Sequence, residues 1–327
     1  MAGHLPPLLF PPDLARALHE VVEVDLDTTL TEFDSPAARA RLATAEVLIT
    51  CWGAPRLDAD ALAAAPLLHA VIHAAGTVKP LVSPPVFERG IVVGSAAAAN
   101  ALPVAEYTLA MILLAGKDAF GISRRYRAER QAIDLITEYP KIGNYGRTVG
   151  ILGASLVGRA VLRLLAPFED LRLLVHDPFL TAAGARALGA ELVELDALFT
   201  RSDVLSIHVP ALSETLGMVN STLLALLPDG ATVINTARGS VVDQEALVDE
   251  LRNGRISAVL DVTEPEVIPA AAQLWELPNV VLTPHLAGSV GTELHRLGAT
   301  AIDEVRRFVQ DKPLRHRVDP IALGSMA

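Results

Sequence analysis

The stretch from Thr148 to Asp177, TVGILGASLVGRAVLRLLAPFEDLRLLVHD, constrains the fold more than any other part of the chain. An apolar run at 149–152 predicts a buried strand, and Gly153 and Gly158 follow it at the spacing of a tight turn into a helix. A second apolar run then ends at Asp177. Backbone N–H groups at such a helix N-terminus bind a pyrophosphate, and a Cβ in the turn would obstruct that approach. The order of strand, glycine turn, helix, strand and acid therefore predicts a unit that binds a dinucleotide.

One position departs from this pattern, because Ser155 stands where the second glycine is usual. Its hydroxyl would either bond a phosphate oxygen or hold the cofactor away, and the sequence leaves both open. A turn whose glycines serve only packing is the alternative to a binding turn. Asp177 would accept the ribose hydroxyls and favours NAD over NADP. A 2′-phosphate at roughly 4 Å from a carboxylate costs on the order of 4 kcal/mol at an effective dielectric of about 20.

The overall composition limits the kind of protein this is. A chain of 327 residues, 51% hydrophobic and 20% charged, predicts a globular protein with room for two domains. A net charge of −11 without a basic cluster argues against nucleic acid or an anionic membrane as partner. With Cys51 as the single cysteine, a reducing compartment fits. The proline-broken N-terminus does not resemble a signal peptide, and the apolar stretch Ala101–Gly116 is expected to be too short to span a bilayer, so we expect a cytoplasmic protein.

The expected fold class is α/β with two domains. In residues 1–100, short apolar runs alternate with alanine-rich helical segments, which predicts a small flavodoxin-like domain. Its predicted strands are Pro7–Phe10, Val21–Val24, Val47–Cys51, Leu68–His73 and Ile91–Gly94. The spacing of His69 and His73 suggests a metal site, but on a strand these side chains lie about 13 Å apart, so no metal is expected.

The second part of the chain is expected to form a doubly wound Rossmann domain inserted into the first. Asn100 is predicted to precede a long linker helix over residues 102–117, and residues 118–147 are polar and expected to be irregular. Further predicted strands lie at Glu191–Glu194, Val204–Val209, Thr232–Asn235, Ala258–Val262 and Val280–Thr283. The predicted division is therefore a substrate domain of residues 1–100 with 287–327, and an NAD-binding domain of residues 101–286.

Three polar residues near predicted strand ends have the chemistry to interconvert a 2-oxo acid and a 2-hydroxy acid. Arg238 offers a planar fork for a carboxylate. His285 would donate a proton to the carbonyl oxygen or take it back from the alcohol. Glu266 would lie beside the imidazole and stabilise its protonated form, with Glu264 as the rival carboxylate. Each could also be an ordinary surface or capping residue, and the prediction rests on the three together.

At these residues the chain resembles the D-isomer-specific 2-hydroxyacid dehydrogenases, the group that includes phosphoglycerate, glycerate, D-lactate and formate dehydrogenases. The blocks that carry the resemblance run from VAEYTL at 104–109 through the glycine turn and HDP at 176–178 to SIHVP at 206–210, NTARG at 235–239, LDV at 260–262 and TPHLAGS at 283–289. Any one block is weak, whereas their common order and spacing are specific. The family places its catalytic Arg, Glu and His at Arg238, Glu266 and His285, and its spacing from Asp261 favours Glu266 over Glu264.

The resemblance also implies binding residues. The substrate carboxylate would be held by the backbone of Gly76 and Thr77, with Asn100 and Arg238. Residues near the cofactor would be Gly153, Ser155, Leu156, Val157, Gly158, Asp177, His208, Pro210, Thr215, Thr236, Ala237, Asp261 and Gly288. Of these, Asp261 would hold the nicotinamide amide, whereas His208 would lie close to the cofactor without acid–base work. Lys79, in a stretch that departs from the family pattern, would either meet a second anionic group of the substrate or be a solvated surface lysine.

The predicted function is hydride transfer between NAD(H) and a small 2-oxo or 2-hydroxy acid of the D series, in a cleft between the domains. The resemblance also implies a homodimer that uses residues 101–147. The alternative is an NAD(H)-sensing binding protein or corepressor-like module on the same fold, since such proteins can keep the three catalytic residues.

Overall fold

The computed structural model describes residues 1–321 and 323, and the chain divides into two compact units. Unit 1 comprises Met1–Pro103 and Ser289–Ala327, and unit 2 comprises Val104–Gly288. The predicted boundaries had assigned residues 101–103 to the second domain and 287–288 to the first. The difference at the first boundary arises because the chain crosses it inside a continuous helix, where no loop marks the change.

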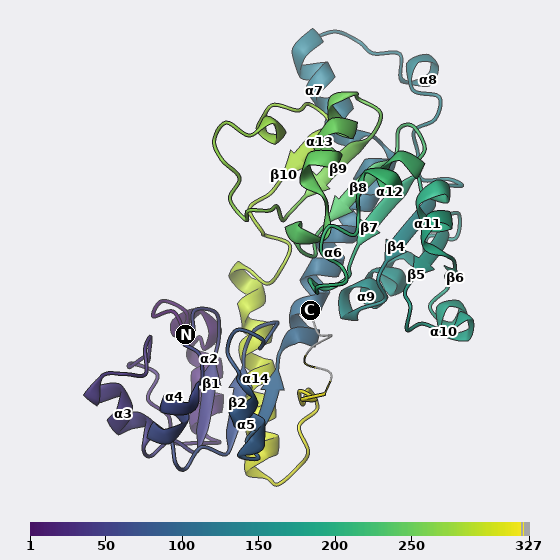
Figure 1. Ribbon diagram of the computed structural model, residues 1–327. Coiled ribbons are helices and arrows are strands. Elements are labelled where there is room, and N and C mark those ends of the chain that lie inside the picture. Colours follow the sequence, from purple (N-terminus) through teal and green to yellow (C-terminus); the bar gives the residue numbers. More distant parts are fainter. Residues whose placement is uncertain (322, 324–327) are drawn as a thin grey trace. The chain divides into compact units, whose positions relative to one another are not determined.

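Unit 2 is built on a parallel sheet of seven strands in the order β10-β9-β8-β7-β4-β5-β6 (Figure 1). The strands are β4 (Thr148–Leu152), β5 (Arg172–His176), β6 (Glu191–Leu192), β7 (Val204–Ile207), β8 (Thr232–Asn235), β9 (Ser257–Leu260) and β10 (Val280–Leu282). Chain order reverses between β4 and β7, and ligands of such sheets bind beyond the carboxyl ends of the strands at that point. The predicted α/β fold with a doubly wound sheet is confirmed.

The central strands of this sheet are buried on both faces, which is why they read as nearly continuous apolar runs in the sequence. Every residue of β4, β7 and β8 is buried, and separate apolar clusters form on the two faces. The connecting helices are α9 (Leu156–Leu165), α10 (Ala182–Ala187), α11 (Leu195–Arg201), α12 (Ser221–Leu226) and α13 (Gln244–Arg252). This packing leaves the loops after the strands as the place for polar side chains.

Helix α6 (Ala97–Gly116) begins in unit 1 and ends in unit 2. The prediction that Asn100 precedes this helix was wrong, because the helix already starts after Ser95, whose Oγ accepts a hydrogen bond from Ala97 N. With this earlier start α6 is long and apolar enough to cross a membrane, contrary to our expectation of its length. One such helix is weak evidence for a membrane, because a core helix passes the same test, and Ala105 and Ile112 pack in a unit 2 cluster.

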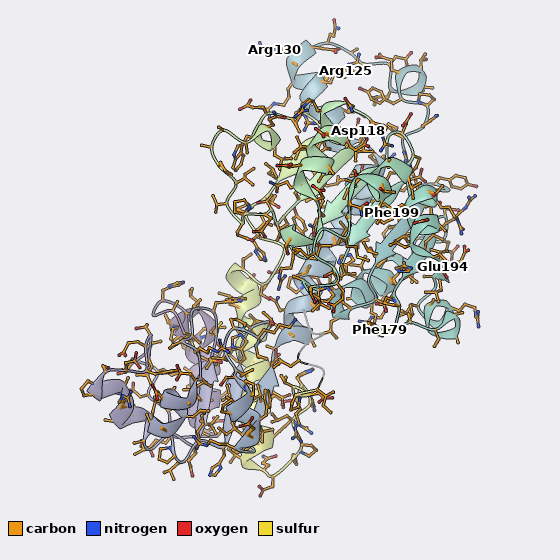
Figure 2. All side chains as sticks on the ribbon, viewed as in Figure 1. Asp118, Arg125, Arg130, Phe179, Glu194 and Phe199 are labelled. Carbon is orange, nitrogen blue, oxygen red and sulfur yellow. The ribbon has the colours of Figure 1, made fainter. Side chains whose placement is uncertain are left out.

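Residues 118–147 contain two helices, α7 (Ala119–Glu129) and α8 (Leu135–Glu138), where the sequence predicted irregular structure. Arg125 bonds Glu129 one turn along α7 at 2.6 Å and Glu138 of α8 at 2.6 Å. Figure 2 shows Arg125 and Arg130 on and just after α7. These ion pairs favour the helical conformation of a segment with no buried residue, which apolar periodicity could not detect.

Unit 1 contains a parallel sheet of three strands in the order β1-β2-β3, namely β1 (Val47–Thr50), β2 (Ala70–His73) and β3 (Val92–Ser95). Its helices are α1 (Pro6–Leu9), α2 (Pro12–His19), α3 (Pro36–Leu42), α4 (Ala59–Ala64), α5 (Pro84–Glu88) and α14 (Leu294–Val309). Helix α14 packs back on α1, as the close contact of Gly298 with Leu9 O shows.

Two predicted strands of unit 1 were wrong. Pro7–Phe10 is mostly helix α1, because a proline is favourable in a first helical turn and here occupies it. Val21–Val24 has the alternation of a strand but forms none in the structure. A strand needs a partner edge as well as a pattern, and this segment pairs with no strand among the described residues.

Candidate active site

The glycine turn after β4 is shaped by two close contacts. Gly153 has φ +96°, and a Cβ there would lie 2.9 Å from His208 C and from Val209 N. A Cβ on Gly158 would lie 2.0 Å from Gly153 O. Both glycines are therefore needed for the turn to form, whether or not a ligand binds to it.

Ser155 is the N-cap of α9, and its Oγ accepts a hydrogen bond from Gly158 N at 3.3 Å. The hydroxyl thus stabilises the helix start, a role that sequence reasoning did not consider. Leu156 and Val157 form the first turn, and the Leu156 side chain is exposed. No other hydrogen bond of the Ser155 hydroxyl is present within the described residues.

Asp177 connects the end of β5 to the glycine turn. Its Oδ2 accepts from Ala154 N at 2.7 Å and its Oδ1 from Phe179 N at 2.8 Å. Each carboxylate oxygen has two acceptor sites, so capacity for the hydroxyls of a ribose remains.

His208 follows β7 beside the turn and is 3% exposed. Its Nε2 lies 2.8 Å from Ser206 Oγ, whereas its Nδ1 has no partner among the described residues. Burial lowers the pKa of His208 to about 3, so the ring is neutral near pH 7 and does not act as a general acid there. An unsatisfied buried nitrogen beside a glycine turn fits a site that a polar cofactor completes.

Two threonines order neighbouring loops. Thr215 Oγ1 donates to Pro210 O at 2.5 Å and accepts from Leu212 N at 2.9 Å. Thr236 Oγ1, after β8, lies 3.1 Å from Thr108 Oγ1 of α6. Both hydroxyls therefore already have partners within the chain.

Asn235 is a site residue that our sequence reasoning missed. It ends β8, is 1% exposed, and its Oδ1 accepts from Ala237 N at 3.0 Å. Its Nδ2 donates to Arg238 O at 2.9 Å, so the amide holds the loop that carries Arg238. The available signal was an amide at the end of a predicted buried strand, where a buried polar group must have partners.

Arg238 is partly buried, and its Nη1 donates to Ala237 O at 2.6 Å. Burial lowers the pKa of Arg238, and the nearby Glu266 carboxylate acts in the opposite direction. An arginine remains charged under these conditions, which leaves a partly desolvated cation at the strand ends. A Cβ on the next residue, Gly239, would lie 2.1 Å from Thr263 C, so this loop packs directly on the loop that leads to Glu266.

His285 and Glu266 are in contact, with His285 Nδ1 2.5 Å from Glu266 Oε1. The rival Glu264 makes a different contact, through its backbone N–H to Gln244 Oε1 at 3.2 Å. A carboxylate accepts a hydrogen bond from the Nδ1–H, which leaves Nε2 as the nitrogen that exchanges a proton with a ligand. Both side chains are about half exposed, at 48% for His285 and 57% for Glu266, so a ligand can approach them.

The backbone of His285 adopts φ +53°, in the left-handed region that is uncommon for residues other than glycine. Asp261, after β9 and 2% exposed, holds this conformation. Its Oδ1 accepts from Leu286 N at 2.9 Å and from Thr283 Oγ1 at 2.6 Å, and its Oδ2 accepts from Ala287 N at 3.0 Å. Asp261 was predicted to hold the nicotinamide amide; the structure gives it three donors in the His285 loop.

Three of the four predicted carboxylate-binding residues, Gly76, Thr77 and Asn100, lie in unit 1, in the loop after β2 and on α6, whereas Arg238 lies in unit 2. The backbone N–H groups of Gly76 and Thr77 make no hydrogen bond to another described residue. Asn100 lies close to Gly76, since its Nδ2 would be 3.5 Å from a Cβ there, and its Oδ1 accepts from Ser289 N at 3.0 Å. Unpaired neighbouring N–H groups are the arrangement that binds an anion.

The remaining predicted residues carry less information. Gly288 is the last residue of unit 2, and its described contacts do not bear on a cofactor. No group of three or more potential metal-ligating side chains occurs within the part of the chain that the structure describes.

Comparison with known proteins agrees with this architecture. Residues 109–287 match the family described as "D-isomer specific 2-hydroxyacid dehydrogenase, NAD binding domain". The D-3-phosphoglycerate dehydrogenase of Mycobacterium leprae is 34% identical over 256 residues, covering 77% of this chain and 47% of that protein. The enzyme of the same name from Archaeoglobus fulgidus is 31% identical over 265 residues, covering 81% of this chain and 50% of that protein.

Solved structures show the same fold. The TT0316 protein from Thermus thermophilus has a TM-score of 0.75 at 28% identity, covering 94% of this chain and 96% of that one. A phosphoglycerate oxidoreductase from Rhizobium etli has a TM-score of 0.81 at 23% identity, covering 97% of this chain and 95% of that one, and supports the fold alone.

Unit 2 is therefore an NAD-binding domain of the doubly wound class, and NAD is its cofactor. The chain belongs to the D-isomer specific 2-hydroxyacid dehydrogenase family. It spans about half the length of the curated relatives that it matches.

Proposed function

We propose that this chain is an NAD-dependent oxidoreductase that interconverts a small 2-oxo acid and its D-2-hydroxy acid. The observation that carries the proposal is the His285–Glu266 contact at 2.5 Å on a loop whose left-handed backbone is held by Asp261. Such a strained, well-supported conformation is typical of a residue placed for function.

Each residue of the set has a distinct role in this proposal. The Arg238 guanidinium binds the substrate carboxylate, because a planar fork pairs with two oxygens at once. His285 donates a proton from Nε2 to the carbonyl oxygen during reduction and removes it during oxidation. Glu266 accepts from Nδ1 and stabilises the ring while it carries the extra proton. Bound NAD supplies or accepts the hydride.

The cofactor is proposed to be held by the glycine turn and its neighbours. Gly153 and Gly158 give the close approach that a pyrophosphate needs, and Asp177 accepts the ribose hydroxyls, which disfavours the 2′-phosphate of NADP. Asp261 acts on the reaction through the His285 loop in this proposal, in place of the nicotinamide contact that we first predicted.

The substrate is proposed to be anionic and small. The free N–H groups of Gly76 and Thr77 would bind a carboxylate oxygen, with Asn100 nearby. Because the curated relatives are named D-3-phosphoglycerate dehydrogenase, 3-phosphoglycerate is the first substrate to test. The predicted homodimer through residues 101–147 stays a prediction, and Ile136 and Tyr145 there are 88% and 86% exposed.

The test is an absorbance assay of the purified chain. NADH with glyoxylate, pyruvate, hydroxypyruvate and bulkier 2-oxo acids, and NAD with 3-phosphoglycerate, should give turnover with at least one compound. His285→Ala should lower that turnover by about 10²- to 10⁴-fold and leave NADH binding, measured by fluorescence, unchanged. NADH binding without turnover across the panel would overturn the proposal in favour of an NAD(H)-sensing protein.

A further inference from the structure

Three neighbouring strands of unit 2, β8, β9 and β10, end in register, because Asn235 pairs with Leu260 and Leu260 pairs with Leu282. The carboxyl ends of parallel strands lie at the same edge of a sheet. The first residue after each strand has a side chain that accepts hydrogen bonds, and these residues are Thr236, Asp261 and Thr283. They form a short polar row at the edge where the reactive loops begin.

Each threonine of this row has the same place relative to a reactive residue. Thr236 stands two residues before Arg238, and Thr283 stands two residues before His285. A contact that fixes either threonine therefore limits the position of the reactive side chain that follows it.

Helix α6 contacts the row through two consecutive residues. The Tyr107 hydroxyl lies 3.0 Å from Thr283 Oγ1, and Thr108 Oγ1 lies 3.1 Å from Thr236 Oγ1. The strands before the two threonines have β9 between them, which separates them by about 10 Å at the usual spacing of about 4.8 Å between neighbouring strands. A phenol reaches farther than a threonine hydroxyl, so adjacent positions of one helix contact both.

The helix is held against the sheet by apolar side chains on the face that carries Thr108. Ala105 and Ile112 pack in one cluster with Ile234 of β8. Positions 105, 108 and 112 recur at helical spacing, and Thr108 between them is fully buried. A buried hydroxyl needs hydrogen-bond partners, and Thr236 supplies one of them.

The direction of the Tyr107 hydrogen bond follows from the contacts of its partner. Thr283 Oγ1 has one proton and donates it to Asp261 Oδ1 at 2.6 Å, so the phenol donates to Thr283. Burial raises the pKa of Tyr107, which keeps the phenol protonated near pH 7. The two bonds end at a carboxylate, and a charged acceptor strengthens the bonds that lead to it.

Asp261 connects Thr283 to the loop that carries His285. Its Oδ1 also accepts from Leu286 N at 2.9 Å, and its Oδ2 accepts from Ala287 N at 3.0 Å. These two amides directly follow His285, whose backbone is left-handed. Loss of the Tyr107 hydroxyl would remove one bond from the start of this loop.

The Thr108 bond has the reverse direction. Thr108 Oγ1 donates to Val104 O at 2.7 Å, so it accepts its other bond from the Thr236 hydroxyl. The turn after Thr236 is closed by the Asn235 amide, whose Nδ2 donates to Arg238 O at 2.9 Å. A bond to α6 therefore fixes the first residue of the closed turn that carries Arg238.

We propose that Tyr107 and Thr108 of α6 brace both reactive loops of unit 2, with Tyr107 as a positioning residue for His285 and Thr108 as a positioning residue for Arg238. Neither side chain acts on the substrate itself. The roles of His285 and Arg238 are those of the proposed dehydrogenase function, on which this assignment rests. Because the two roles differ, loss of one hydroxyl affects proton transfer and loss of the other affects binding of the substrate carboxylate.

Steady-state kinetics of variants that lack one hydroxyl test this division. Tyr107→Phe should lower kcat by about threefold to tenfold and leave the KM for the substrate unchanged. Thr108→Val should raise that KM by a similar factor and leave kcat unchanged, and Thr108→Ser, which keeps the hydroxyl, should restore the original KM. A variant without its expected change, or the same change in both, would overturn the proposal.

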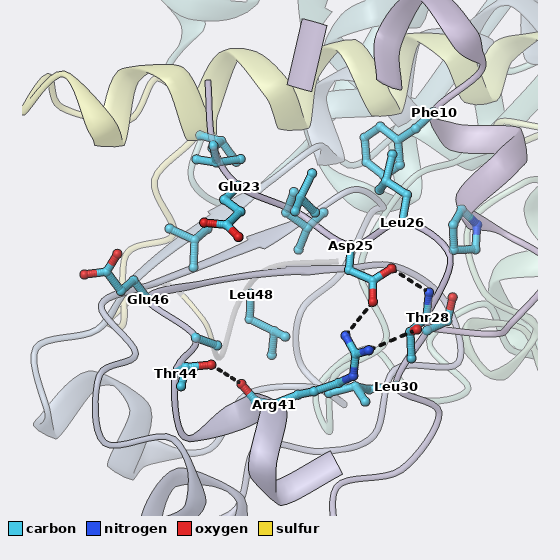
Figure 3. Close-up of a pocket in the computed structure, with 18 of the residues that line it drawn as sticks. Phe10, Glu23, Asp25, Leu26, Thr28, Leu30, Arg41, Thr44, Glu46 and Leu48 are labelled. Carbon is cyan, nitrogen blue, oxygen red and sulfur yellow. Dashed lines mark hydrogen bonds and ion pairs between the residues drawn. The ribbon is translucent and has the colours of Figure 1, made fainter. Parts of the chain in front are cut away.

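Matched controls remove hydrogen-bonded hydroxyls elsewhere. Tyr139→Phe removes a phenol hydroxyl that accepts from Arg125 Nη1 at 3.1 Å. Thr44→Val removes a hydroxyl that donates to Arg41 O at 3.3 Å in unit 1, at the wall of a cavity of about 870 Å³ (Figure 3). Both variants should keep the original kcat and KM. Losses equal to those of the α6 variants would show general destabilisation, against the proposal.

A double-mutant cycle tests whether Tyr107 acts through Thr283. Thr283→Val removes the acceptor of the phenol, so Tyr107→Phe should have little further effect on kcat in that background. Fully additive losses would show that Tyr107 acts by another route and would overturn the proposal.

Hydrogen exchange does not depend on turnover, and it separates a failure of the brace from a failure of the proposed function. The Leu286 and Ala287 amides should exchange several-fold faster in Tyr107→Phe than in the unaltered chain, and Tyr139→Phe should not change them. Unchanged exchange in Tyr107→Phe would overturn the brace. Faster exchange in a chain without turnover on any compound would support the brace and overturn the proposed function alone.

Discussion

Both units contain an exposed histidine bonded to a carboxylate, and the two pairs differ in how they are held. His285 and Glu266 in unit 2 are 2.5 Å apart and 48% and 57% exposed, whereas His295 and Asp13 in unit 1 are 2.9 Å apart and 50% and 58% exposed. Distance and exposure alone hardly separate them.

The surroundings do separate them. His295 lies on the regular helix α14, whereas His285 has a left-handed backbone that Asp261 fixes through three donors. The comparison teaches that a candidate active site is recognised by the support beneath a side-chain pair rather than by the pair itself.

The largest expected effect comes from removing each ring. His285→Ala should lower kcat by about 10²- to 10⁴-fold, the usual contribution of a general acid or base. His295→Ala removes a side chain of the same size and polarity and should leave kcat unchanged. Steady-state kinetics of both variants measure the effect, with far-UV circular dichroism as a folding control. Equal losses of kcat in the two variants would contradict the comparison.

The support can be tested with the rings intact. Asp261→Asn removes acceptor capacity from beneath the His285 loop and should lower kcat by up to about 10²-fold, since a small misplacement of a catalytic group has an effect of this order. Asp13→Asn makes the same chemical change at the carboxylate that contacts His295 in unit 1 and should have no effect. If Asp261→Asn retained full kcat while binding NADH normally, the loop would not need this support.

A smaller effect is expected from Gly239→Ala. The new methyl group would meet the Thr263–Glu264 backbone, and overpacking of this kind lowers the free energy of unfolding by about 1–3 kcal/mol. Gly3→Ala adds the same methyl group where nothing lies within 4 Å and should be neutral. Urea denaturation measures both, and an unchanged midpoint for Gly239→Ala would show that the two loops are not in firm contact.

The smallest expected effect is on the pH dependence of stability, and it comes from two buried histidines, one in each unit. Burial lowers the pKa of His73 to about 4 and that of His208 to about 3, from an ordinary value of 6.5. Below about pH 6.5 the unfolded chain binds protons that the folded chain does not, so stability falls as the pH is lowered. The loss due to His73 should end near pH 4 and that due to His208 near pH 3.

Native-state hydrogen exchange at β2 and β7 between pH 7 and pH 3 would follow the two units separately. His73→Gln and His208→Gln should each flatten the pH dependence of their own unit only. An unchanged pH dependence in either variant would exclude that ring as the source.

The sequence predicted unit 2 better than unit 1, and the reason is physical. The central strands of unit 2 are buried on both faces, so an apolar run such as that of β4 is unambiguous. In unit 1, the run at 7–10 is as apolar as a strand, but proline at the helix start decides its conformation. For Val21–Val24 the pattern is that of a strand, and pairing depends on an edge that the local sequence cannot reveal.

The candidate site was also predicted only in part. The contact between His285 and Glu266 was anticipated, because the order of motifs constrains which strand ends carry them. The roles of Asn235, Ser155 and Asp261 were not, because each acts through backbone groups of residues near it in a folded loop. Such partners are defined by loop geometry, which a sequence pattern does not specify.

The buried Glu304 of α14 has a consequence for how much of the C-terminal segment the protein can lose. It is 1% exposed, and its carboxylate accepts hydrogen bonds from Arg315 N at 3.1 Å and His316 N at 3.2 Å. Truncation before Arg315 would leave the buried Glu304 carboxylate without these hydrogen-bond donors. It would also uncover the edge of β3. A protein trimmed there would expose both margins of its smaller sheet, and we expect it to stack into oligomers of growing length.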